Sequence, residues 1–402
     1  MAGQIGARDS LVQWPRAFRV EYPHRARLPA PCGTLWQNSV VTTGWTVTGG
    51  VKDLTDASAK GAPAAHPARL SQLDGLRGFA ALVIMLYHTA MVFRTAGPFV
   101  RGYLLVDLFF LLSGFVLAVS TERKLNAGIG AFAFTRARFV RLWPLVAVGA
   151  GVAAAWAIWS GRSPVEIALA LALDVAMLPV LTGRGPFYRL NGPQWTLFWE
   201  LVANLAHALL LRRVPTRWLP LIAAAMGALL VHAVRVQGSD TMGVNALTWQ
   251  TWWTPVPRVF WSYVLGVWLG RLHRDGTRWP ALPWPLALAL PIAGIMAVPY
   301  LPLSQAHGDL AFVMGFLPLA MWLVAMARIP DWLAPRLDWL GAYSLPLYCV
   351  HLTVLVAVST LGHALPYRVL AIAASCALAL VFHRLISFRG KPLAHKSAAA
   401  GA

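Results

Sequence analysis

The chain has 402 residues, of which 58% are hydrophobic and only 12% are charged. Soluble domains carry about 25% charged residues, so this composition excludes a soluble fold, a disordered chain and a disulfide-stabilised scaffold. The formal net charge is +19, but the basic residues stand in short clusters between apolar runs, which is typical of membrane topology and contact with anionic lipids, and not of nucleic-acid binding. The composition therefore predicts an all-α polytopic membrane protein.

The first 68 residues differ from the rest of the chain, because they mix Pro, Gly, Thr, Ser and Arg and contain no apolar run long enough for a signal peptide. We expect a mostly disordered cytoplasmic tail there. A mis-called start codon is a second interpretation, with Val51 as the start, since no methionine lies between Met1 and Met85. A membrane domain is expected over residues 69–389, and a short basic cytoplasmic tail over residues 390–402.

Ten segments of the chain are apolar and long enough to predict membrane-spanning helices, which need about 20 such residues. They are Leu76–Phe93, Gly102–Ser120, Leu142–Ser160, Gln194–Leu211, Trp218–Val234, Arg258–Gly270, Pro285–Tyr300, Asp309–Ala327, Gly341–Leu361 and Pro366–Ile386. An eleventh run, Val165–Thr182, is apolar but contains Glu166, Asp174 and Pro179. If it spanned the membrane, every later loop would change sides.

The charge between the segments decides how the eleventh run is interpreted. If Val165–Thr182 does not span, most of the arginines and lysines between segments lie on the cytoplasmic side, whereas most lie outside if it does. The positive-inside rule favours the first arrangement. We therefore predict ten spans in the cell membrane, both termini in the cytoplasm, and Val165–Thr182 as a re-entrant or interfacial helix on the outer side.

Ionisable residues within the spans are candidate functional groups, because they are costly at membrane depth. His88 near the outer end of the first span, Asp107 near that of the second and Glu200 in the fourth are expected at a similar depth, and His351 near mid-depth. An imidazole among carboxylates suits general-base catalysis, and Asp107 or Glu200 is an equally good partner for His88. Pairing that only holds helices together is the alternative interpretation.

Basic residues gather at the predicted cytoplasmic mouth, where Arg136, Arg138 and Arg141 precede Pro144. Guanidinium groups match phosphate oxygens, so the cluster suits an anionic cytosolic donor such as an acyl-CoA; a purely topological role is the alternative. Arg77 lies near the inner end of the first span, about three helical turns from His88 and on the same face.

Five motifs in this order resemble those of the acyltransferase-3 family of integral-membrane O-acyltransferases. They are Leu73–Gly78 leading to His88, Val106–Phe115, Arg136–Arg138 followed by Arg141–Pro144, Trp195–Glu200, and Ser344–Tyr348 leading to His351. The matches run from Leu70 to Arg389, which is nearly all of the chain beyond the first 68 residues. Two positions depart from the family pattern, because Leu201 stands where a second acid is common and Thr196 replaces a serine.

The resemblance implies transfer of an acyl group, often acetyl, from a cytosolic acyl-CoA to a hydroxyl of a carbohydrate or glycolipid. It implies His88 as the catalytic base and the arginines Arg136 and Arg138 in donor binding, without a permanently bound cofactor or metal. Further candidates within the motifs are Ser113, Trp195, Tyr348 and His351.

A proton-coupled transporter or flippase of a glycolipid or small anion is the alternative function, since buried histidine and carboxylates also suit a proton relay. The acyl chain, the acceptor and the oligomeric state stay open at this point. So does the choice between direct transfer and a two-step route through an acylated residue.

Overall fold

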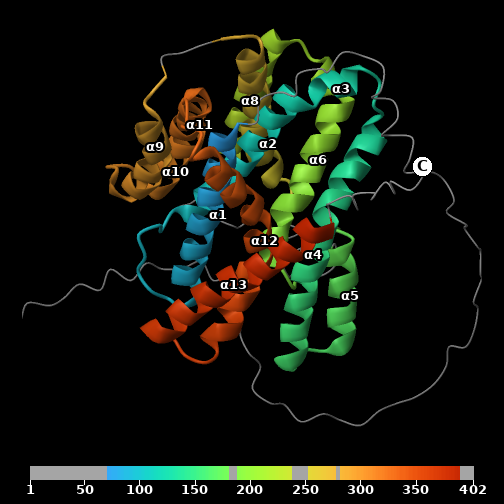
Figure 1. Cartoon of the computed structure of the whole chain (residues 1–402), viewed down its shortest axis with the longest axis vertical. Coiled ribbons are helices and arrows are strands. Elements are labelled where there is room, and N and C mark those ends of the chain that lie inside the picture. The colour runs from blue at the N-terminus through green and yellow to red at the C-terminus, as the bar shows by residue number, and fades with distance from the viewer. Residues whose placement is uncertain (1–69, 181–187, 238–251, 278–280, 390–402) are drawn as a thin grey trace, which may run out of the picture. The chain divides into compact units, whose positions relative to one another are not determined.

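The computed structural model describes residues 70–180, 188–237, 252–277 and 281–389 (Figure 1). The chain divides into Met1–His66 and Pro67–Ala402, and every described residue belongs to the second unit. The tails predicted over residues 1–68 and 390–402 therefore lie outside the described residues. Within those residues the regular structure is helical and contains no strand, which confirms the predicted all-α class.

The helices follow one another along the chain with short connections. They are α1 (Ser71–Val92), α2 (Val106–Ser120), α3 (Glu122–Asn126), α4 (Ala131–Trp159), α5 (Pro164–Val175), α6 (Trp195–Leu209), α7 (Leu219–Gln237), α8 (Pro255–Arg274), α9 (Trp284–Ala297), α10 (Gln305–Ala311), α11 (Leu317–Met326), α12 (Ala334–Ser359) and α13 (Leu365–Arg389). A π-helical stretch, Phe312–Phe316, joins α10 to α11.

Seven helical segments of the described chain are long and apolar enough to cross a membrane, where the sequence predicted ten. They are Ser71–Val92, Gly102–Ser120, Ala131–Trp159, Thr216–Val236, Gln305–Met326, Ala334–Ser359 and Leu365–Leu385. Of the other three predicted spans, α6 has only 15 residues and Trp284–Tyr300 is a shorter apolar helix. The third, α8, has 20 residues but contains three arginines and a histidine, so its apolar character is low.

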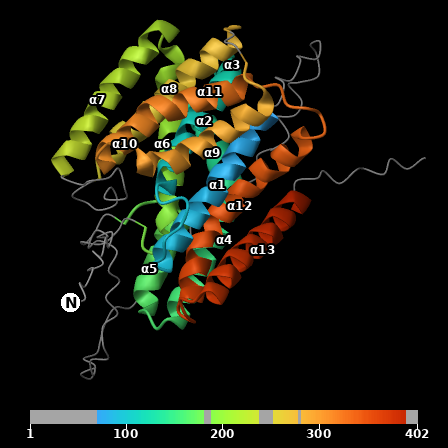
Figure 2. The same cartoon turned by 90° about the vertical axis from the view of Figure 1, so that its left-hand side faces the viewer.

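Helices α1 and α12 pack side by side and run in the same direction (Figure 2). Near the start of both helices, Gly78 faces Leu340 so closely that a Cβ atom on the glycine would lie 2.3 Å from the Leu340 side chain. Further along both helices, His88 meets His351. The close approach therefore fixes the register that brings the two histidines together.

Helices α2 and α8 form a second close pair, also parallel. At the start of the pair, Asp107 meets Arg258. Further along, Gly266 lies so near Leu111 that a Cβ atom on the glycine would lie 2.1 Å from the Leu111 carbonyl oxygen. Only glycine allows the two backbones to approach this closely. Helices α2 and α8 therefore pack tightly along their length.

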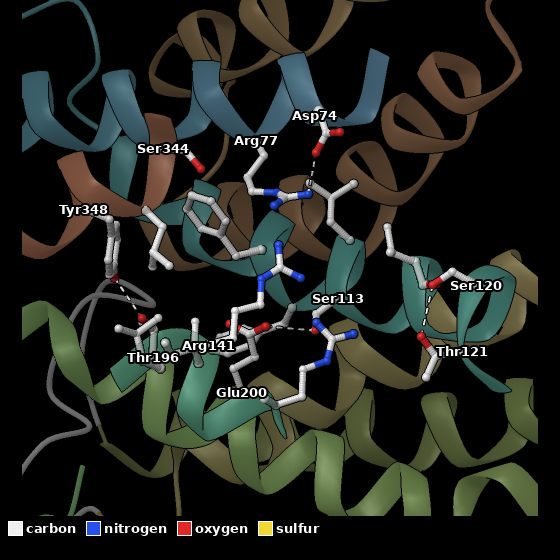
Figure 3. A pocket seen from close by; sticks show the side chains of 18 residues that line it. Asp74, Arg77, Ser113, Ser120, Thr121, Arg141, Thr196, Glu200, Ser344 and Tyr348 are labelled. Atoms are coloured by element: carbon white, nitrogen blue, oxygen red, sulfur yellow. Dashed lines mark hydrogen bonds and ion pairs between the residues drawn. The ribbon is translucent and has the colours of Figure 1, made fainter. Parts of the chain in front are cut away.

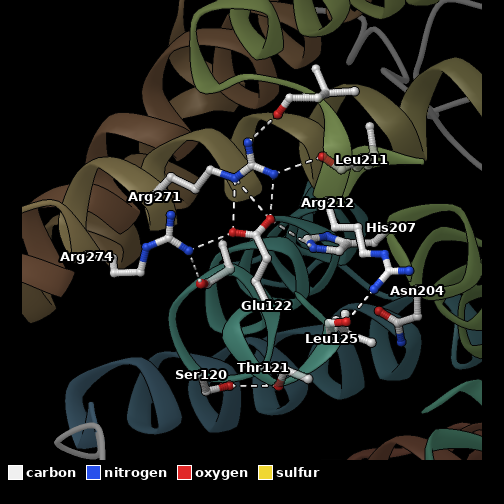
Figure 4. Close-up of polar contacts among 12 residues, drawn as sticks. Ser120, Thr121, Glu122, Leu125, Asn204, His207, Leu211, Arg212, Arg271 and Arg274 are labelled. Carbon is white, nitrogen blue, oxygen red and sulfur yellow. Dashed lines mark hydrogen bonds and ion pairs between the residues drawn. The ribbon is translucent and has the colours of Figure 1, made fainter. Parts of the chain in front are cut away.

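A buried cluster around Glu122 joins the ends of α2, α6 and α8 (Figure 4). The Glu122 carboxylate accepts hydrogen bonds from Arg271 Nη2 at 2.5 Å and Arg274 Nη1 at 2.6 Å, and His207 Nε2 lies 3.3 Å from its Oε1 atom. Burial alone raises the pKa of Glu122, but the hydrogen bonds from His207, Arg271 and Arg274 outweigh it and lower the pKa from 4.5 to about 2. The carboxylate therefore stays charged and holds three helix ends together.

Helix α5, which lies within the eleventh run, is too short to cross a membrane by itself. It has 12 residues and ends at Val175, which gives about 18 Å of helix. Two residues further on, Met177 has a φ of +56°, the left-handed conformation typical of the turn after a helix. The chain then turns toward α6, where the Asn191 backbone N–H donates to Asp174 Oδ2 at 3.3 Å.

The cluster at Glu122 shows where α6 ends relative to its neighbours. Because α6 ends beside the ends of α2 and α8, the turn at α5 and the helix α6 together return the chain to the side where α2 ends. The part of Val165–Thr182 that the structure describes is therefore not an additional crossing.

Candidate active site

A cavity of about 520 Å³ lies among helices α1, α2, α4, α6 and α12 (Figure 3). This volume is in the range of small-molecule sites, which is about 300–1,000 Å³. Along α2, the lining residues extend from Phe109 to Thr121, a rise of about 18 Å. The cavity is therefore a deep, narrow space that runs along the helix axes.

One wall of the cavity is basic. Arg77 from α1 and Arg138 and Arg141 from α4 line it. Arg77 donates to Asp74 at 2.7 Å, whereas the structure gives Arg138 and Arg141 no hydrogen bond or ion pair with any described residue; Arg138 lies over the Phe134 ring at 5.6 Å. The Glu200 carboxylate interacts electrostatically with Arg138 but forms no ion pair with it among the described residues. Two guanidinium groups that face a cavity without a carboxylate bound to either are suited to bind an anion.

Arg136 is the one predicted donor-binding arginine that does not line the cavity. Its side chain is exposed, because two residues along a helix turn the side chain by about 200°, away from the face that Arg138 occupies. Arg138 and Arg141 are three residues apart and share that face. The structure therefore brings Arg77, Arg138 and Arg141 together and leaves Arg136 outside.

The cavity also contains a hydroxyl and a carboxylate, close to the arginines of α4 (Figure 3). Ser113 Oγ lies 3.2 Å from Glu200 Oε1 and 3.4 Å from Asn204 Oδ1, and Tyr263 donates to the same Asn204 oxygen at 3.0 Å. Ser113 and Glu200 both line the cavity. Glu200 is therefore part of the cavity wall, and it accepts a hydrogen bond from Ser113.

His88 forms a hydrogen bond with a second histidine. Its Nδ1 atom lies 2.9 Å from His351 Nε2. On the far side of the His351 ring, Nδ1 lies 3.0 Å from the carbonyl oxygens of Leu347 and Tyr348. Both of these are acceptors, so His351 Nδ1 carries the proton and its Nε2 accepts.

The direction of this hydrogen bond sets the tautomer of His88. His88 Nδ1 must be the donor to His351, which leaves the lone pair on His88 Nε2. A neutral imidazole in this tautomer is able to take a proton at Nε2. Sequence reasoning considered Asp107 and Glu200 as partners of His88, and the structure provides His351 instead.

Asp107 lies in a buried ion pair. Arg258 donates to it through Nη2 at 2.6 Å and through Nε at 3.0 and 3.2 Å, and Ser262 Oγ lies 3.3 Å away. The Asp107 side chain is fully buried, and the Arg258 guanidinium lies 5.9 Å from the ring of Trp195. This contact fits the alternative interpretation of the intramembrane acids, in which a charged pair only holds two helices together.

Sequence reasoning missed Arg258 as the partner of Asp107, because it treated this arginine as the first residue of a predicted span. No sequence spacing relates the two residues, which lie on different helices. Only the packing of α2 against α8 brings them together.

The cavity approaches the histidine pair at Tyr348. Tyr348 lines the cavity, its ring packs edge-to-face on Phe109 at 5.7 Å, and the His351 ring lies 5.8 Å away on the next turn of α12. His88 itself is not among the cavity-lining residues. One side chain, Tyr348, therefore stands between the anion-binding wall and the predicted base.

Comparisons with known proteins agree with this architecture. The model of a family described as an acyltransferase domain, acyltransferase-3, matches residues 70–384. A relative from Rhizobium radiobacter, "Protein 2 in picA locus", is 36% identical over 185 residues, which cover 42% of this chain and 95% of the relative. No solved structure matches the chain.

A second relative, the acyltransferase MdmB from Streptomyces mycarofaciens, is 30% identical over 240 residues. The match covers 52% of this chain and 58% of that protein, so the chain spans little more than half of its length. Because the family model covers most of the chain, the protein belongs to the acyltransferase-3 family. It is an integral-membrane acyltransferase.

Proposed function

We propose that the protein transfers an acyl group, acetyl above all, from a cytosolic acyl-CoA to a hydroxyl group of a carbohydrate or glycolipid. The observation that carries the proposal is the pair Arg138 and Arg141, which line the cavity with no carboxylate bound to either. Phosphate groups are the anions that such forked guanidinium groups bind best. Arg77 stands on the same wall and completes a site for the nucleotide end of the donor.

The shape of the cavity supports a long, thin donor. It extends about 18 Å along α2, from Thr121 to Phe109 near Tyr348, and the arginines lie between these ends, close to Ser113 and Glu200 (Figure 3). The pantetheine arm of an acyl-CoA is extended and mostly uncharged, so it suits the mixed apolar and hydroxyl lining beyond the arginines. Such a donor places its thioester near Tyr348, one helical turn from His351. Since acyl-CoA is cytosolic, the Thr121 end of the cavity faces the cytoplasm in this proposal.

The histidine pair supplies the base for the reaction. His88 Nε2 takes the proton from the acceptor hydroxyl as its oxygen attacks the thioester carbonyl carbon. The C–S bond then breaks, and His88 returns the proton to the departing thiolate of CoA. His351 holds the His88 ring in the tautomer that this step needs, and Glu200 and Ser113 bind the polar groups of the donor arm.

The purified protein in detergent, given acetyl-CoA and a candidate glycan or glycolipid, tests the proposal. Release of free CoA together with a mass increase of the acceptor is expected, and His88→Ala is expected to abolish both. A carrier of glycolipids or anions releases no CoA under these conditions. Full acyl transfer by His88→Ala contradicts the assignment of the base. A comparison of surface glycan masses from cells with and without the protein identifies the acyl group and the acceptor.

A further inference from the structure

Two hydroxyl groups meet at the end of the cavity nearest the histidine pair (Figure 3). Thr196 Oγ1 lies 3.0 Å from the Tyr348 hydroxyl oxygen, and both hydroxyls contact the Pro193 carbonyl oxygen, at 3.0 and 3.2 Å respectively. Both residues line the cavity. They come from different elements, Thr196 from the first turn of α6 and Tyr348 from α12, so the packing of two helices positions the pair.

The position of this hydroxyl pair is fixed relative to the predicted base. The backbone oxygen of Tyr348 is one of the two acceptors 3.0 Å from His351 Nδ1, and His351 in turn contacts His88 at 2.9 Å. Phe109 packs edge-to-face on the Tyr348 ring and limits its rotation. A thioester that reaches this end of the cavity therefore lies beside the two hydroxyls, on the cavity side of Tyr348.

The number of donors exceeds what the resting contacts require. Thr196 and Tyr348 have one hydroxyl hydrogen each, and the Pro193 carbonyl is within reach of both. If Tyr348 turns its hydrogen toward another acceptor, Thr196 still donates to Pro193. If Thr196 turns instead, Tyr348 takes over that role. Either hydroxyl is thus free to donate elsewhere without leaving a buried carbonyl unsatisfied, which is otherwise a costly loss.

We infer that the hydroxyls of Tyr348 and Thr196 bind the oxyanion that forms during acyl transfer; this inference rests on the proposed function. When the acceptor oxygen bonds to the thioester carbonyl carbon, the electron pair of the C=O π bond moves onto the carbonyl oxygen. Hydroxyl donors placed at that oxygen stabilise the charge more than they stabilise the neutral thioester. When the intermediate collapses, the C=O bond re-forms, the C–S bond breaks and the thiolate receives the proton held by His88.

Kinetics of two isosteric variants test the inference in the full-length protein. Tyr348→Phe and Thr196→Val each remove one hydroxyl while keeping the shape of the side chain. Loss of one oxyanion donor lowers kcat by roughly 100- to 1,000-fold, so each variant is expected to show such a loss with an unchanged Kd for CoA. Thr196→Ser keeps the hydroxyl and is expected to retain most of the wild-type kcat. The pH profile of the remaining activity stays that of the wild type, because His88 is untouched.

Tyr343→Phe is the matched control. Tyr343 also lies on α12 and loses a buried hydrogen bond in this variant, to the Cys376 carbonyl oxygen at 2.7 Å, but it does not line the cavity. Its kcat is expected to stay near that of the wild type. The inference is overturned if Tyr348→Phe and Thr196→Val keep kcat within about threefold of the wild type, or if their loss of kcat follows an equal loss of CoA binding. Wild-type protein that releases no CoA from any acyl-CoA contradicts the proposed function itself.

Discussion

His88 and His351 form a hydrogen bond of 2.9 Å between helices α1 and α12. The two residues are 263 positions apart, and they meet because the helices run in parallel and in close contact. His351 is buried, and its own Nδ1–H is directed at the backbone of its helix. The pair therefore presents one free ring nitrogen, Nε2 of His88.

We predict that His351 acts on catalysis through His88. His351→Ala leaves His88 Nδ1 without its acceptor, so the ring is no longer held in one tautomer, and we expect kcat to fall by roughly 100-fold with an unchanged KM for the donor. His351→Gln places a carbonyl oxygen near the same position and is expected to recover part of the activity. Steady-state kinetics with acetyl-CoA measure both variants. His383→Ala on α13 is the control, and a similar loss in that variant argues against a specific role of His351.

The arginine wall gives a second prediction. Removing Arg138 and Arg141 together takes away charge-assisted hydrogen bonds worth about 1.5–3 kcal/mol each, so the KM for acyl-CoA is expected to rise by 100-fold or more, while kcat at saturating donor changes little. Arg136→Ala, on the exposed side of the same helix, is expected to keep the wild-type KM. Equal effects of Arg136→Ala and of the double variant contradict the cavity as the donor site and favour a general effect of positive charge.

Asp107 is predicted to act on stability. Asp107→Asn removes the carboxylate that accepts the short hydrogen bonds of the buried Arg258 guanidinium, and breaking a buried ion pair in this way costs about 3–5 kcal/mol, so a marked fall in Tm in detergent is expected. Replacing both partners, as in Asp107→Leu with Arg258→Met, is expected to recover much of that loss. Asp275→Asn, at the exposed end of α8, serves as the control. If Asp107→Asn keeps the wild-type Tm but has no activity, Asp107 has a catalytic role after all.

The Glu122 cluster predicts how stability depends on pH. The pKa of Glu122 is about 2 in the folded protein, below its usual value in an unfolded chain, so the folded state gains stability from the charged form. That gain, on the order of 3 kcal/mol, is fully present above about pH 4.5 and is lost as the pH falls toward 2. Tm measured across this range is expected to fall more steeply for the wild type than for Glu122→Gln. Parallel curves for the two proteins contradict the prediction.

The sequence predicts some parts of this molecule well because they depend on local patterns. Apolar runs identify the helices, and charge between them identifies α5 as a partial crossing. The spacing between Arg77 and His88 places both on one face of α1, since this depends only on helix geometry. Charge within a helix is harder to interpret from sequence, which is why α8, with three arginines, was expected to span as an ordinary apolar segment.

Contacts between distant helices are what the sequence does not predict. Asp107 was grouped with His88 from the sequence because both are expected at a similar depth in the membrane. In the structure, the rotation of α2 about its axis directs Asp107 toward Arg258. The same depth argument did not select His351 as the partner, because the register of α1 on α12 depends on how closely Gly78 packs against Leu340. The separation of Arg136 from Arg138 was predictable from helix periodicity, but the side of α4 that faces the cavity was not.

The continuity of α1 has a consequence for the choice of donor. The helix runs unbroken and without proline from Ser71 to Val92, whereas α4 and α12 each contain an internal proline. Arg77 and His88 are therefore held about 16 Å apart along one straight helix. In the proposed function, this distance sets the separation between the donor's phosphate group at Arg77 and its thioester near His88. Under the proposed function, a donor with a shortened arm that is anchored at Arg77 is expected to leave its thioester short of the base, so selection of the donor by length as well as by charge is expected.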